Sequence, residues 1–561
     1  MLKPIDHDLE RRVQEIGRDL ITEIAERRRA AGPIDRGLDR MLSRGMADEA
    51  LRVALLRFID VLPVLDEHRD LTGHLGEYLG PLDLPLVRAF RLAVSPRRGD
   101  RAQALVAGGV RQAMTWIARR FLGGSTAEEA LASAAQLWNQ GIACSLDRVG
   151  EAVLSEVEAE DYQRRYLDLL GQAATLVSGW PVRPLLERGH GRDLPRLNVS
   201  IKLSSLDPRI SALAPEVSAA RIGERLRPIL LAARRNGSAV SIDMEQYALK
   251  ETVLCAFKQL LVTPELRDWP DAGIALQAYL RDTQADLQDL ITWAEGRGTP
   301  ITVRLVRGAY WDYESVIAAQ NGWPVPVWSE KWQTDQCYEH CLRLLLAHCP
   351  TIETAVATHN LRSMAFAMAC AEAQGLTPDR IEFQMLYGMA DAYAEVPPAR
   401  GYRLRMYVPF GDWLPGMAYL VRRLLENASS QSFQRMALAS TLMPDALLAV
   451  PQGREVRDSI QQPGPPAGGI RPSERWAELP AFRNEPLHRF TDPRERSAFC
   501  AALDKARVEL GIDGTRRGHE EHPCLDAPPC RDYPLLIDGK AVFTADWIVS
   551  VYPADPRRVI G

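Results

Sequence analysis

The feature that most constrains the fold is a repeated alternation of short β-rich runs with helical stretches, which begins near residue 195. A run that is apolar on both faces and is followed by a helix is typical of a parallel sheet covered by helices. Seven such units within about 210 residues fit an α/β fold, the (βα)8 barrel of the TIM type, better than an open sheet. The runs are LNVSIKL (197–203), SAVSIDM (238–244), GIALQAY (273–279), ITVRLVR (301–307), ETAVATH (353–359), IEFQML (381–386) and RLRMYVP (403–409).

The chain on either side of these runs predicts three further regions. Before the barrel, apolar residues recur at helical spacing in segments separated mostly by Pro and Gly, although Gly17 interrupts the first segment. The helical segments are 9–29, 47–62, 86–92, 101–121, 126–139 and 151–178. We therefore predict a helical arm and α-domain at 1–180, a barrel at 181–445 with its eighth strand in SSQSFQRM (429–436), a linker and helical tract at 446–532, and a hairpin-rich incomplete domain at 533–561.

The charge balance and the hydropathy pattern argue against several classes of protein. Lys and Arg number 68 against 73 Asp and Glu, a net charge of −5, whereas a chain that coats nucleic acid needs an excess of basic residues. The N-terminus carries a charge every two or three positions, unlike a signal peptide, and no window of about 18 uncharged apolar residues is present. We expect a cytoplasmic protein that binds no nucleic acid, while attachment to a membrane surface stays open.

Cysteine and histidine residues form two clusters that could suggest a metal. Nine cysteines, an odd number without a repeated spacing, are typical of free thiols in a reducing compartment. One cluster, 337–349, lies on a predicted amphipathic helix and the other, 519–530, in a Pro-rich loop. Neither has the paired short spacing of a zinc site, so we interpret them as core and linker and predict no metal.

Each of the seven runs ends in or near a polar residue. In a (βα)8 barrel the carboxyl ends of the strands surround the active site, whereas packing alone would favour Val, Ile or small residues there. The set is rich in cations and amides and lacks a nucleophile paired with a base, which suits a pocket that holds anions and leaves electron transfer to a cofactor. No Gly-rich nucleotide loop follows a strand, so Arg304, Lys331 and Arg423 are candidates for phosphate contacts. The strand-end residues are Lys202, Asp243, Gln277, Arg304, Thr358, His359, Asn360, Gln384 and Tyr407.

A pair of arginines in MAYLVRRLLENASS (417–430) is the second candidate feature. Arg422 and Arg423 lie about 100° apart on a helix, and Glu426 is within one turn of both. A solvated face is one interpretation, since the chain contains other Arg pairs. The aliphatic neighbours favour a partly buried pair, and two fixed guanidinium groups form a clamp for a small carboxylate or a phosphate.

Several motifs, taken together, resemble one family. In order and spacing they are similar to the flavin-dependent proline dehydrogenase barrel of the bacterial bifunctional Proline utilization A family, over roughly residues 140 to 450. The helical N-terminal region resembles the arm and α-domain of that family, and residues 533–561 resemble the opening of its aldehyde dehydrogenase domain. The motifs are SIKLSSL, SIDMEQY, LQAYLRD, VRLVRGAYWD, ATHN, FQMLYGM, YVPFG and YLVRRLLEN.

The resemblance implies a proline site beside a bound FAD. Lys202, Arg422 and Arg423 would bind the proline carboxylate, and Glu151 would pair with Arg422 and gate the site. Arg304 would stabilise charge beside flavin N5, whereas Asp243 and His359 are interpreted as an orienting group and a donor to the cofactor rather than as bases. The walls around the substrate ring would be Tyr310, Leu386 and Tyr407, and the FAD contacts would be Gln277, Arg304, Val306, Gly308, Trp311, Lys331, Thr358, His359, Asn360, Gln384, Arg423 and Glu426.

The implied reaction is oxidation of L-proline to 1-pyrroline-5-carboxylate, with hydride passing from C5 to FAD and electrons then to a ubiquinone-type acceptor. Such an acceptor implies peripheral contact with the inner face of a membrane. The family's NAD-dependent aldehyde dehydrogenase activity needs a downstream nucleophile and an NAD-binding fold, so we do not expect that activity here, and we expect that domain to be missing or separate. Two alternatives stay open: a catalytically idle scaffold, and a flavin-independent barrel enzyme that binds a phosphorylated substrate through the Arg pair.

Overall fold

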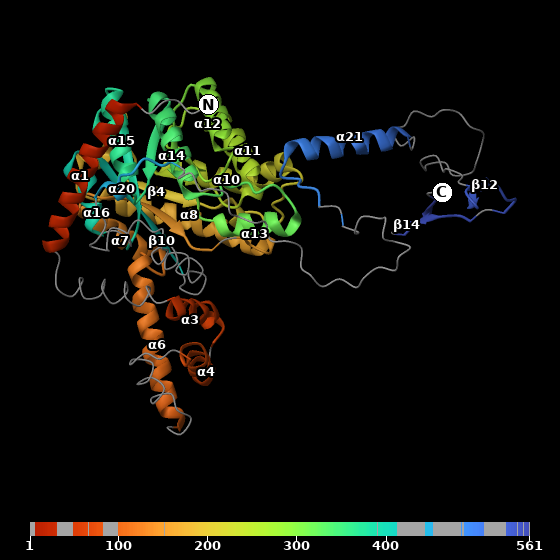
Figure 1. The fold of residues 1–561 in the computed structure, drawn as a ribbon, viewed down its shortest axis with the longest axis horizontal. Coiled ribbons are helices and arrows are strands. Elements are labelled where there is room, and N and C mark those ends of the chain that lie inside the picture. The colour runs from red at the N-terminus through yellow and green to blue at the C-terminus, as the bar shows by residue number, and fades with distance from the viewer. Residues whose placement is uncertain are drawn as a thin grey trace. The chain divides into compact units, whose positions relative to one another are not determined.

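The computed structural model of the chain contains two compact units, residues 1–484 and 485–561. Within them it describes residues 6–30, 49–65, 67–81, 99–150, 152–389, 391–411, 444–452, 484, 487–509, 534–546, 548–553 and 555–559. The first unit is built around a strand barrel with helices on its outside (Figure 1).

Eight parallel strands close the barrel in the order β1-β10-β9-β8-β7-β6-β5-β4, which confirms the predicted fold class. Parallel strands in such a barrel are buried on both faces, and all six residues of β6 are buried here. The register places the carboxyl ends of all eight strands at one end of the barrel. The strands are β1 (Ala143–Arg148), β4 (Leu197–Ile201), β5 (Ala239–Ile242), β6 (Ala272–Gln277), β7 (Ile301–Val306), β8 (Ile352–Ala357), β9 (Ile381–Leu386) and β10 (Arg403–Phe410).

Seven strands match the seven predicted runs, but the prediction for the eighth is wrong. The eighth strand is β1, which pairs with both β10 and β4, for example through Cys144 opposite Met406 and Leu197. It lies within the 1–180 region predicted as helical, so the barrel begins before residue 181, and the segment 429–436 lies outside the described residues. A six-residue strand between two helices gives a period-2 signal too short to stand out from the helical periodicity around it.

Helices cover the outside of the barrel and begin at residues that cap them. Ser155 Oγ accepts a hydrogen bond from Glu158 N (3.2 Å) at the start of α8, and Asn360 Oδ1 accepts one from Ser363 N (3.3 Å) at the start of α15. The helices are α7 (Ala127–Asn139), α8 (Glu156–Ser178), α10 (Pro215–Arg235), α11 (Lys250–Leu261), α12 (Thr283–Arg297), α13 (Trp311–Asn321), α14 (Lys331–Ala347) and α15 (Leu361–Ala373). Short elements of this unit are η1 (Leu62–Val64), α9 (Pro184–Glu187), β2 (Arg188–Gly189), β3 (Arg192–Asp193), η3 (Leu203–Ser205), η4 (Tyr247–Leu249), η5 (Pro378–Arg380), α16 (Asp391–Ala394), α17 (Val396–Ala399) and α20 (Pro444–Leu447).

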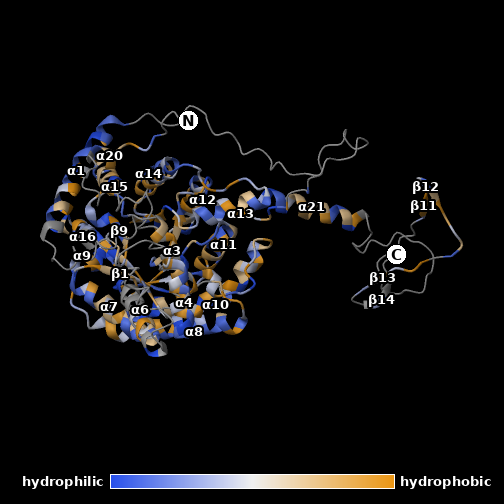
Figure 2. Cartoon of the chain, turned by 60° about the horizontal axis from the view of Figure 1, so that its bottom comes forward, coloured by the Kyte–Doolittle hydropathy of each residue, from blue (hydrophilic) through white to orange (hydrophobic). Residues whose placement is uncertain are grey.

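The N-terminal helix α1 (His7–Ala30) packs along α15 on the outside of the barrel (Figure 1). Its residues are hydrophilic on one side and apolar on the other (Figure 2), and the buried side is formed by Val13, Ile16, Leu20 and Ile24. Gly17 lies on this buried side, where an added Cβ would come within 2.4 Å of Leu448 Cδ2. The helix therefore continues through the glycine that interrupts the sequence pattern, because the missing side chain makes room for Leu448.

Three other helices of the N-terminal region form a small core of their own. Apolar residues of α3 (Glu49–Val61), α4 (His68–Leu79) and α6 (Gly99–Phe121) pack together, and Val149, just after β1, joins them. Five of the six helical segments predicted before the barrel are thus confirmed as α1, α3, α6, α7 and α8, and the sixth, 86–92, lies outside the described residues.

The second unit contains one helix and two hairpins. The antiparallel pairs β11–β12 and β13–β14 lie within the 533–561 segment in which the sequence predicts hairpins. The elements are α21 (Pro493–Glu509), β11 (Leu535–Ile537), β12 (Lys540–Val542), β13 (Val551–Tyr552) and β14 (Asp555–Val559).

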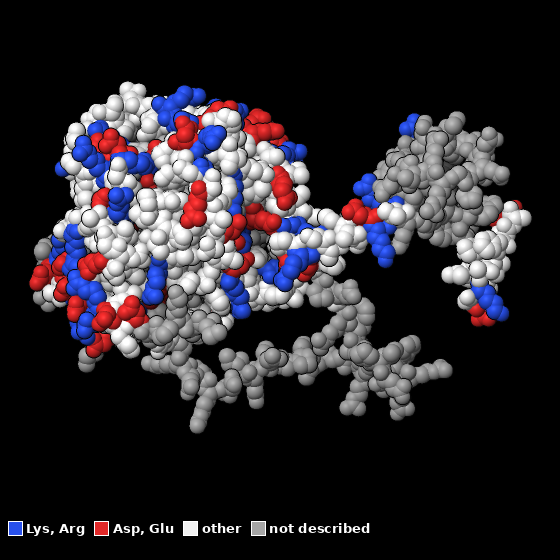
Figure 3. All heavy atoms as spheres, turned by 90° about the horizontal axis from the view of Figure 1, so that it is seen from above, with Lys and Arg blue, Asp and Glu red and all other residues white. Residues whose placement is uncertain are grey.

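Charged residues of both signs are interspersed on the face of the molecule drawn in Figure 3. This mixture agrees with the small net charge of −5. Across the part of the chain that the structure describes, no helix is long and apolar enough to cross a membrane. The same residues contain no group of three or more His, Cys, Asp or Glu side chains suited to holding a metal ion.

The contact between α1 and α15 provides a test of this packing. Arg362 on α15 is 5% exposed and binds Glu10 on α1 (2.8 Å) and Glu339 on α14 (2.8 Å). Arg362→Met would leave the largely buried Glu339 carboxylate (side chain 13% exposed) without this cation, so we expect urea denaturation to show a free energy of unfolding lower by about 3 kcal/mol. Arg12→Met removes an exposed pair with Glu372 between the same two helices (2.7 Å) and should cost less than about 1 kcal/mol. Equal losses in the two variants would contradict this account.

Candidate active site

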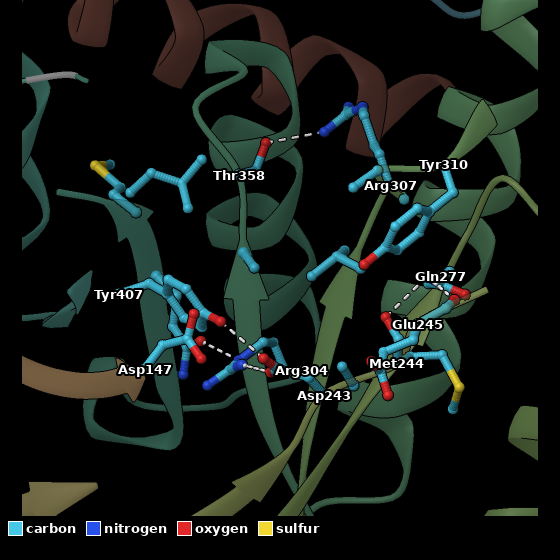
Figure 4. Close-up of a pocket in the computed structure, with 18 of the residues that line it drawn as sticks. Asp147, Asp243, Met244, Glu245, Gln277, Arg304, Arg307, Tyr310, Thr358 and Tyr407 are labelled. Carbon is cyan, nitrogen blue, oxygen red and sulfur yellow. Dashed lines mark hydrogen bonds and ion pairs between the residues drawn. The ribbon is translucent and has the colours of Figure 1, made fainter. Parts of the chain in front are cut away.

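The carboxyl ends of the eight strands surround a cavity of about 420 Å³. Figure 4 shows Asp147 and Tyr407 on one side of it, Gln277 on the other, and Arg304 between them. Every strand contributes at least one lining side chain from its end or from the loop that follows it. The cavity brings together twelve residues that the sequence predicts for the site: Lys202, Asp243, Gln277, Arg304, Val306, Gly308, Tyr310, Thr358, His359, Gln384, Leu386 and Tyr407.

Arg304, on β7, is the most densely bonded cation of the cavity. Its Nε donates to Gln384 Oε1 (2.7 Å), its Nη1 to Asp243 Oδ1 (2.7 Å) and Ser200 Oγ (3.0 Å), and its Nη2 to Ser145 Oγ (3.4 Å). A guanidinium has five N–H donors, and four of those of Arg304 bind acceptors on the described residues. One Nη2 hydrogen is left, and none of the described residues accepts it. The side chain therefore presents a fixed positive charge and one donor to the cavity.

Asp243 is held as a carboxylate by its neighbours. Its Oδ2 accepts from the Tyr407 hydroxyl (2.7 Å) and lies 3.3 Å from Lys202 Nζ, while Oδ1 binds Arg304. Burial disfavours the charge, but Lys202 and Arg304 outweigh it and hold the pKa of Asp243 below its ordinary value. Its oxygens are committed to these donors, which suits an orienting group.

Lys202 is shared between two buried carboxylates. Besides Asp243, its Nζ binds Asp147 Oδ1 at 2.5 Å. Burial raises the pKa of Asp147 to about 6, the charge of Asp243 adds to the effect, and Lys202 offsets it only in part. Asp147 thus changes its charge close to neutral pH, beside the cation expected to bind the substrate.

Tyr407, on β10, supplies a donor to this group of charges. Burial and the charges of Asp147 and Asp243 raise the pKa of Tyr407 well above its ordinary value. The phenol therefore stays protonated and donates to Asp243, and its ring lies 5.2 Å from the Arg304 guanidinium carbon.

On the opposite side of the cavity, Gln277 offers an unused acceptor. Its Nε2 donates to the carbonyl oxygens of Met244 and Glu245, both at 3.1 Å, which fixes the orientation of the amide. Its Oε1 is buried and has no hydrogen-bond donor among the described residues. A buried acceptor without a partner is costly, so this atom is suited to meet a donor of a ligand.

The loop after β7 approaches the cavity closely at Gly308. This glycine has a φ of 125°, which favours glycine, and an added Cβ would lie 2.4 Å from Tyr279 Cδ1. The loop is anchored by Arg307, whose guanidinium binds Asp335 (2.7 Å), Thr358 Oγ1 (3.0 Å) and Ser363 Oγ (2.7 Å). The loop after β7 is therefore tied to α14 and α15.

Three of the predicted FAD contacts do not line the cavity. Trp311 is 42% exposed and donates from Nε1 to the Trp328 carbonyl oxygen (2.7 Å), Lys331 pairs with Asp335, and Asn360 caps α15. They lie at the starts of α13, α14 and α15. Four other predicted site residues, Glu151, Arg422, Arg423 and Glu426, lie outside the described residues, so the clamp and the gate stay predictions.

One ring nitrogen of His359 is held by the backbone at the end of the barrel. Its Nε2 accepts a hydrogen bond from the backbone N–H of Leu386 (2.9 Å), next to the end of β9. This bond fixes the ring and places the proton of a neutral imidazole on Nδ1. The arrangement agrees with an orienting or donating group better than with a base at Nε2.

Sequence reasoning missed three charged residues of the cavity, Asp147, Glu245 and Arg307. Asp147 was missed because β1 was not identified, although the polar residue after the apolar run in IACSLD is the same signal that marks the other strand ends. Arg307 closes the run ITVRLVR, and its partner Asp335 is 28 residues away in sequence. No local pattern predicts that pairing.

The charge of Asp147 generates a prediction on stability. A carboxyl whose pKa is raised in the folded state stabilises the fold below its unfolded pKa, near 4, and loses that contribution as the pH rises through about 6. The quantity to compare is the free energy of unfolding of the wild type minus that of Asp147→Asn. We expect this difference to decrease between pH 4 and pH 7, by at most about 3 kcal/mol. Urea denaturation of both proteins at several pH values measures the difference. A difference that stays constant or rises with pH would contradict the assignment.

Comparisons with known proteins agree with this geometry. The proline dehydrogenase family model matches residues 130–436, and the Proline utilization A N-terminal domain model matches residues 10–121. The bifunctional protein PutA of Klebsiella aerogenes is 34% identical over 360 residues, which are 63% of this chain and 26% of that protein. Proline dehydrogenase 2 of Bacillus subtilis is 29% identical over 319 residues, 56% of this chain and 88% of that protein.

A solved structure supports the same conclusion. Proline utilization A from Bdellovibrio bacteriovorus, inactivated by N-propargylglycine, superposes with a TM-score of 0.81 and 31% identity, covering 98% of this chain and 52% of that one. This chain thus spans about a quarter of the length of the PutA relative from Klebsiella aerogenes and about half of that solved chain. Since the proline dehydrogenase model covers more than half of the sequence, the chain belongs to the proline dehydrogenase family.

Proposed function

We propose that this chain binds FAD at the open end of the barrel and catalyses the oxidation of L-proline to 1-pyrroline-5-carboxylate, with a quinone as electron acceptor. The observation that carries the proposal is a pair of hydrogen-bonding groups in the cavity that have no partner among the described residues: one Nη2 hydrogen of Arg304, and the buried Oε1 of Gln277. They offer a cationic donor and a neutral acceptor on different sides of one cavity. Relatives in the family support the choice of substrate.

The flavin ring fits these two groups chemically. Its N5 and O4 are acceptors that suit the Arg304 donor, and its N3–H is a donor that suits Gln277 Oε1. The cavity of about 420 Å³ has room for a flat ring system, and the backbone at Gly308 lines it. In this proposal Gln384, Val306 and His359 complete the surroundings of the ring.

The remainder of the FAD would extend towards the starts of α13, α14 and α15. Helix N-termini bind phosphate groups well, because their N–H groups and dipoles face the anion. Residues there that would bind the pyrophosphate and adenosine are Trp311, Lys331, Thr358 and Asn360, with Arg423 and Glu426. Lys331 is 41% exposed, so a ligand can reach it.

Proline would bind on the side of the cavity that carries Lys202 and Tyr407. Lys202, with Arg422 and Arg423, would bind the carboxylate, and Glu151 would pair with Arg422 and gate the entrance. Asp147 and Asp243 flank the Lys202 ammonium group there, at 2.5 and 3.3 Å. The walls formed by Tyr310, Leu386 and Tyr407 would surround the ring and exclude water.

The reaction takes a hydride from C5 of proline and a proton from its nitrogen, and a C=N bond forms between these two atoms. FAD, when bound, supplies the acceptor for the hydride. Arg304 would stabilise the negative charge that develops as the hydride leaves the substrate, and Asp243 would hold that guanidinium in place. A quinone dissolved in a membrane would then require peripheral contact of the chain with the membrane surface on the cytoplasmic side.

Anaerobic absorption spectroscopy of the purified chain, supplied with FAD, tests the proposal. We expect bands of an oxidised flavin that bleach on addition of L-proline, because hydride transfer reduces the ring. D-proline is the matched control, since it has the same charges and ring with the carboxylate on the wrong side, and it should leave the bands in place. Absence of flavin bands, or equal bleaching by both enantiomers, would contradict the assignment.

A further inference from the structure

A chain of buried polar side chains continues from Arg304 into the barrel, away from the cavity. Its next members are Gln384 and Glu382, two residues apart on β9 and therefore on the same face of that strand. Glu382 is 3% exposed and Gln384 is 5% exposed. Glu382 does not line the cavity, so it can act on a ligand there only through other residues.

Glu382 is held as a carboxylate by two arginines of β10. Its Oε2 accepts from Arg403 Nε (2.6 Å), and its Oε1 accepts from Arg405 Nε (2.8 Å). Burial opposes the charge, but the two guanidinium groups outweigh it and hold the pKa of Glu382 well below its ordinary value. An ionised carboxylate can only accept hydrogen bonds.

This restriction fixes the amide of Gln384. Its Nε2 donates to Glu382 Oε1 (2.6 Å), and its Oε1 accepts from Arg304 Nε (2.7 Å). With the amide turned by 180°, its oxygen would face the carboxylate and its NH2 would face the guanidinium, and both contacts would be repulsive. The charge of Glu382 therefore decides which end of the amide meets Arg304.

We propose that Glu382 is a positioning residue for the reaction: it fixes the amide of Gln384, and Gln384 in turn holds the Arg304 guanidinium in the orientation that serves the bound flavin. This inference rests on the proposed function. It assigns a role in the reaction to a carboxylate that contacts neither substrate nor cofactor.

The barrel offers a matched control in Glu353 on β8. It is also 3% exposed and also binds an arginine through both oxygens, Arg192 Nε to Oε1 (2.8 Å) and Arg192 Nη2 to Oε2 (2.9 Å). Its other hydrogen bond comes from Thr302 Oγ1 (3.3 Å), and among the described residues it has no bond to Arg304 or Gln384. Glu353→Gln therefore removes a comparable buried charge without touching the chain that ends at Arg304.

The experiment compares Glu382→Gln with Glu353→Gln in the FAD-loaded protein. Both should lose stability, but only Glu382→Gln should lower kcat, by about tenfold or more, with KM for L-proline changed less than about threefold. The flavin midpoint potential, measured without substrate, should become more negative only in Glu382→Gln, because a displaced Arg304 stabilises reduced flavin less. A tenfold weaker preference for the reduced form corresponds to about 30 mV for a two-electron couple.

A double-mutant cycle with Arg304→Met separates positioning from a merely structural role. If Glu382 acts through Arg304, Glu382→Gln should shift the midpoint potential of the wild type but not that of Arg304→Met. Should Glu382→Gln fail to fold, Glu382→Asp takes its place, since it keeps the charge between the two arginines and withdraws the carboxylate from the amide. An unchanged potential in a folded Glu382 variant, or an equal shift in Glu353→Gln, would overturn the proposal. A wild type that L-proline does not reduce would instead contradict the proposed function.

Discussion

Burial of the Arg304 charge inside the barrel is the constraint on which the rest of the site depends. A guanidinium taken out of water is costly unless its donors find acceptors. Four strands each supply one, from Ser145 on β1, Ser200 on β4, the end of β5 at Asp243, and Gln384 on β9. Because these strands are distant in sequence and meet only in the closed barrel, folding itself creates the orientation of the guanidinium.

The same constraint explains why the interior beside the cavity is polar. Lys202 and Arg304 pair with Asp147 and Asp243, and the two arginines of β10 share one carboxylate, Glu382. In such an interior one side chain serves both folding and chemistry, because removal of a carboxylate leaves a buried cation unpaired and also changes the field in the cavity. Asp147 differs from the other carboxylates of this interior, since burial raises its pKa to about 6 and its charge therefore changes near that pH.

Sequence patterns predict much of this arrangement, and what they miss has physical causes. Seven strands have apolar runs long enough to recognise, and their polar ends predict Lys202, Asp243, Gln277 and Arg304 as cavity residues. Strand β1 is short and lies between helices, so its Asp147 is missed with it. The role of Glu382 could not be predicted, because it depends on a side chain two strands away and on the orientation of an amide. The family resemblance adds the assignment of flavin and proline, which the residue pattern alone leaves open.

The central claim is that the barrel holds Arg304 in its working orientation before any ligand binds. Crystal structures of the purified chain with and without FAD test it most directly. We expect both to show the bonds from Arg304 to Gln384 Oε1 and Asp243 Oδ1, with the remaining Nη2 hydrogen directed at the flavin ring in the loaded form. A guanidinium that points elsewhere without FAD and turns into the cavity only on binding would contradict the claim.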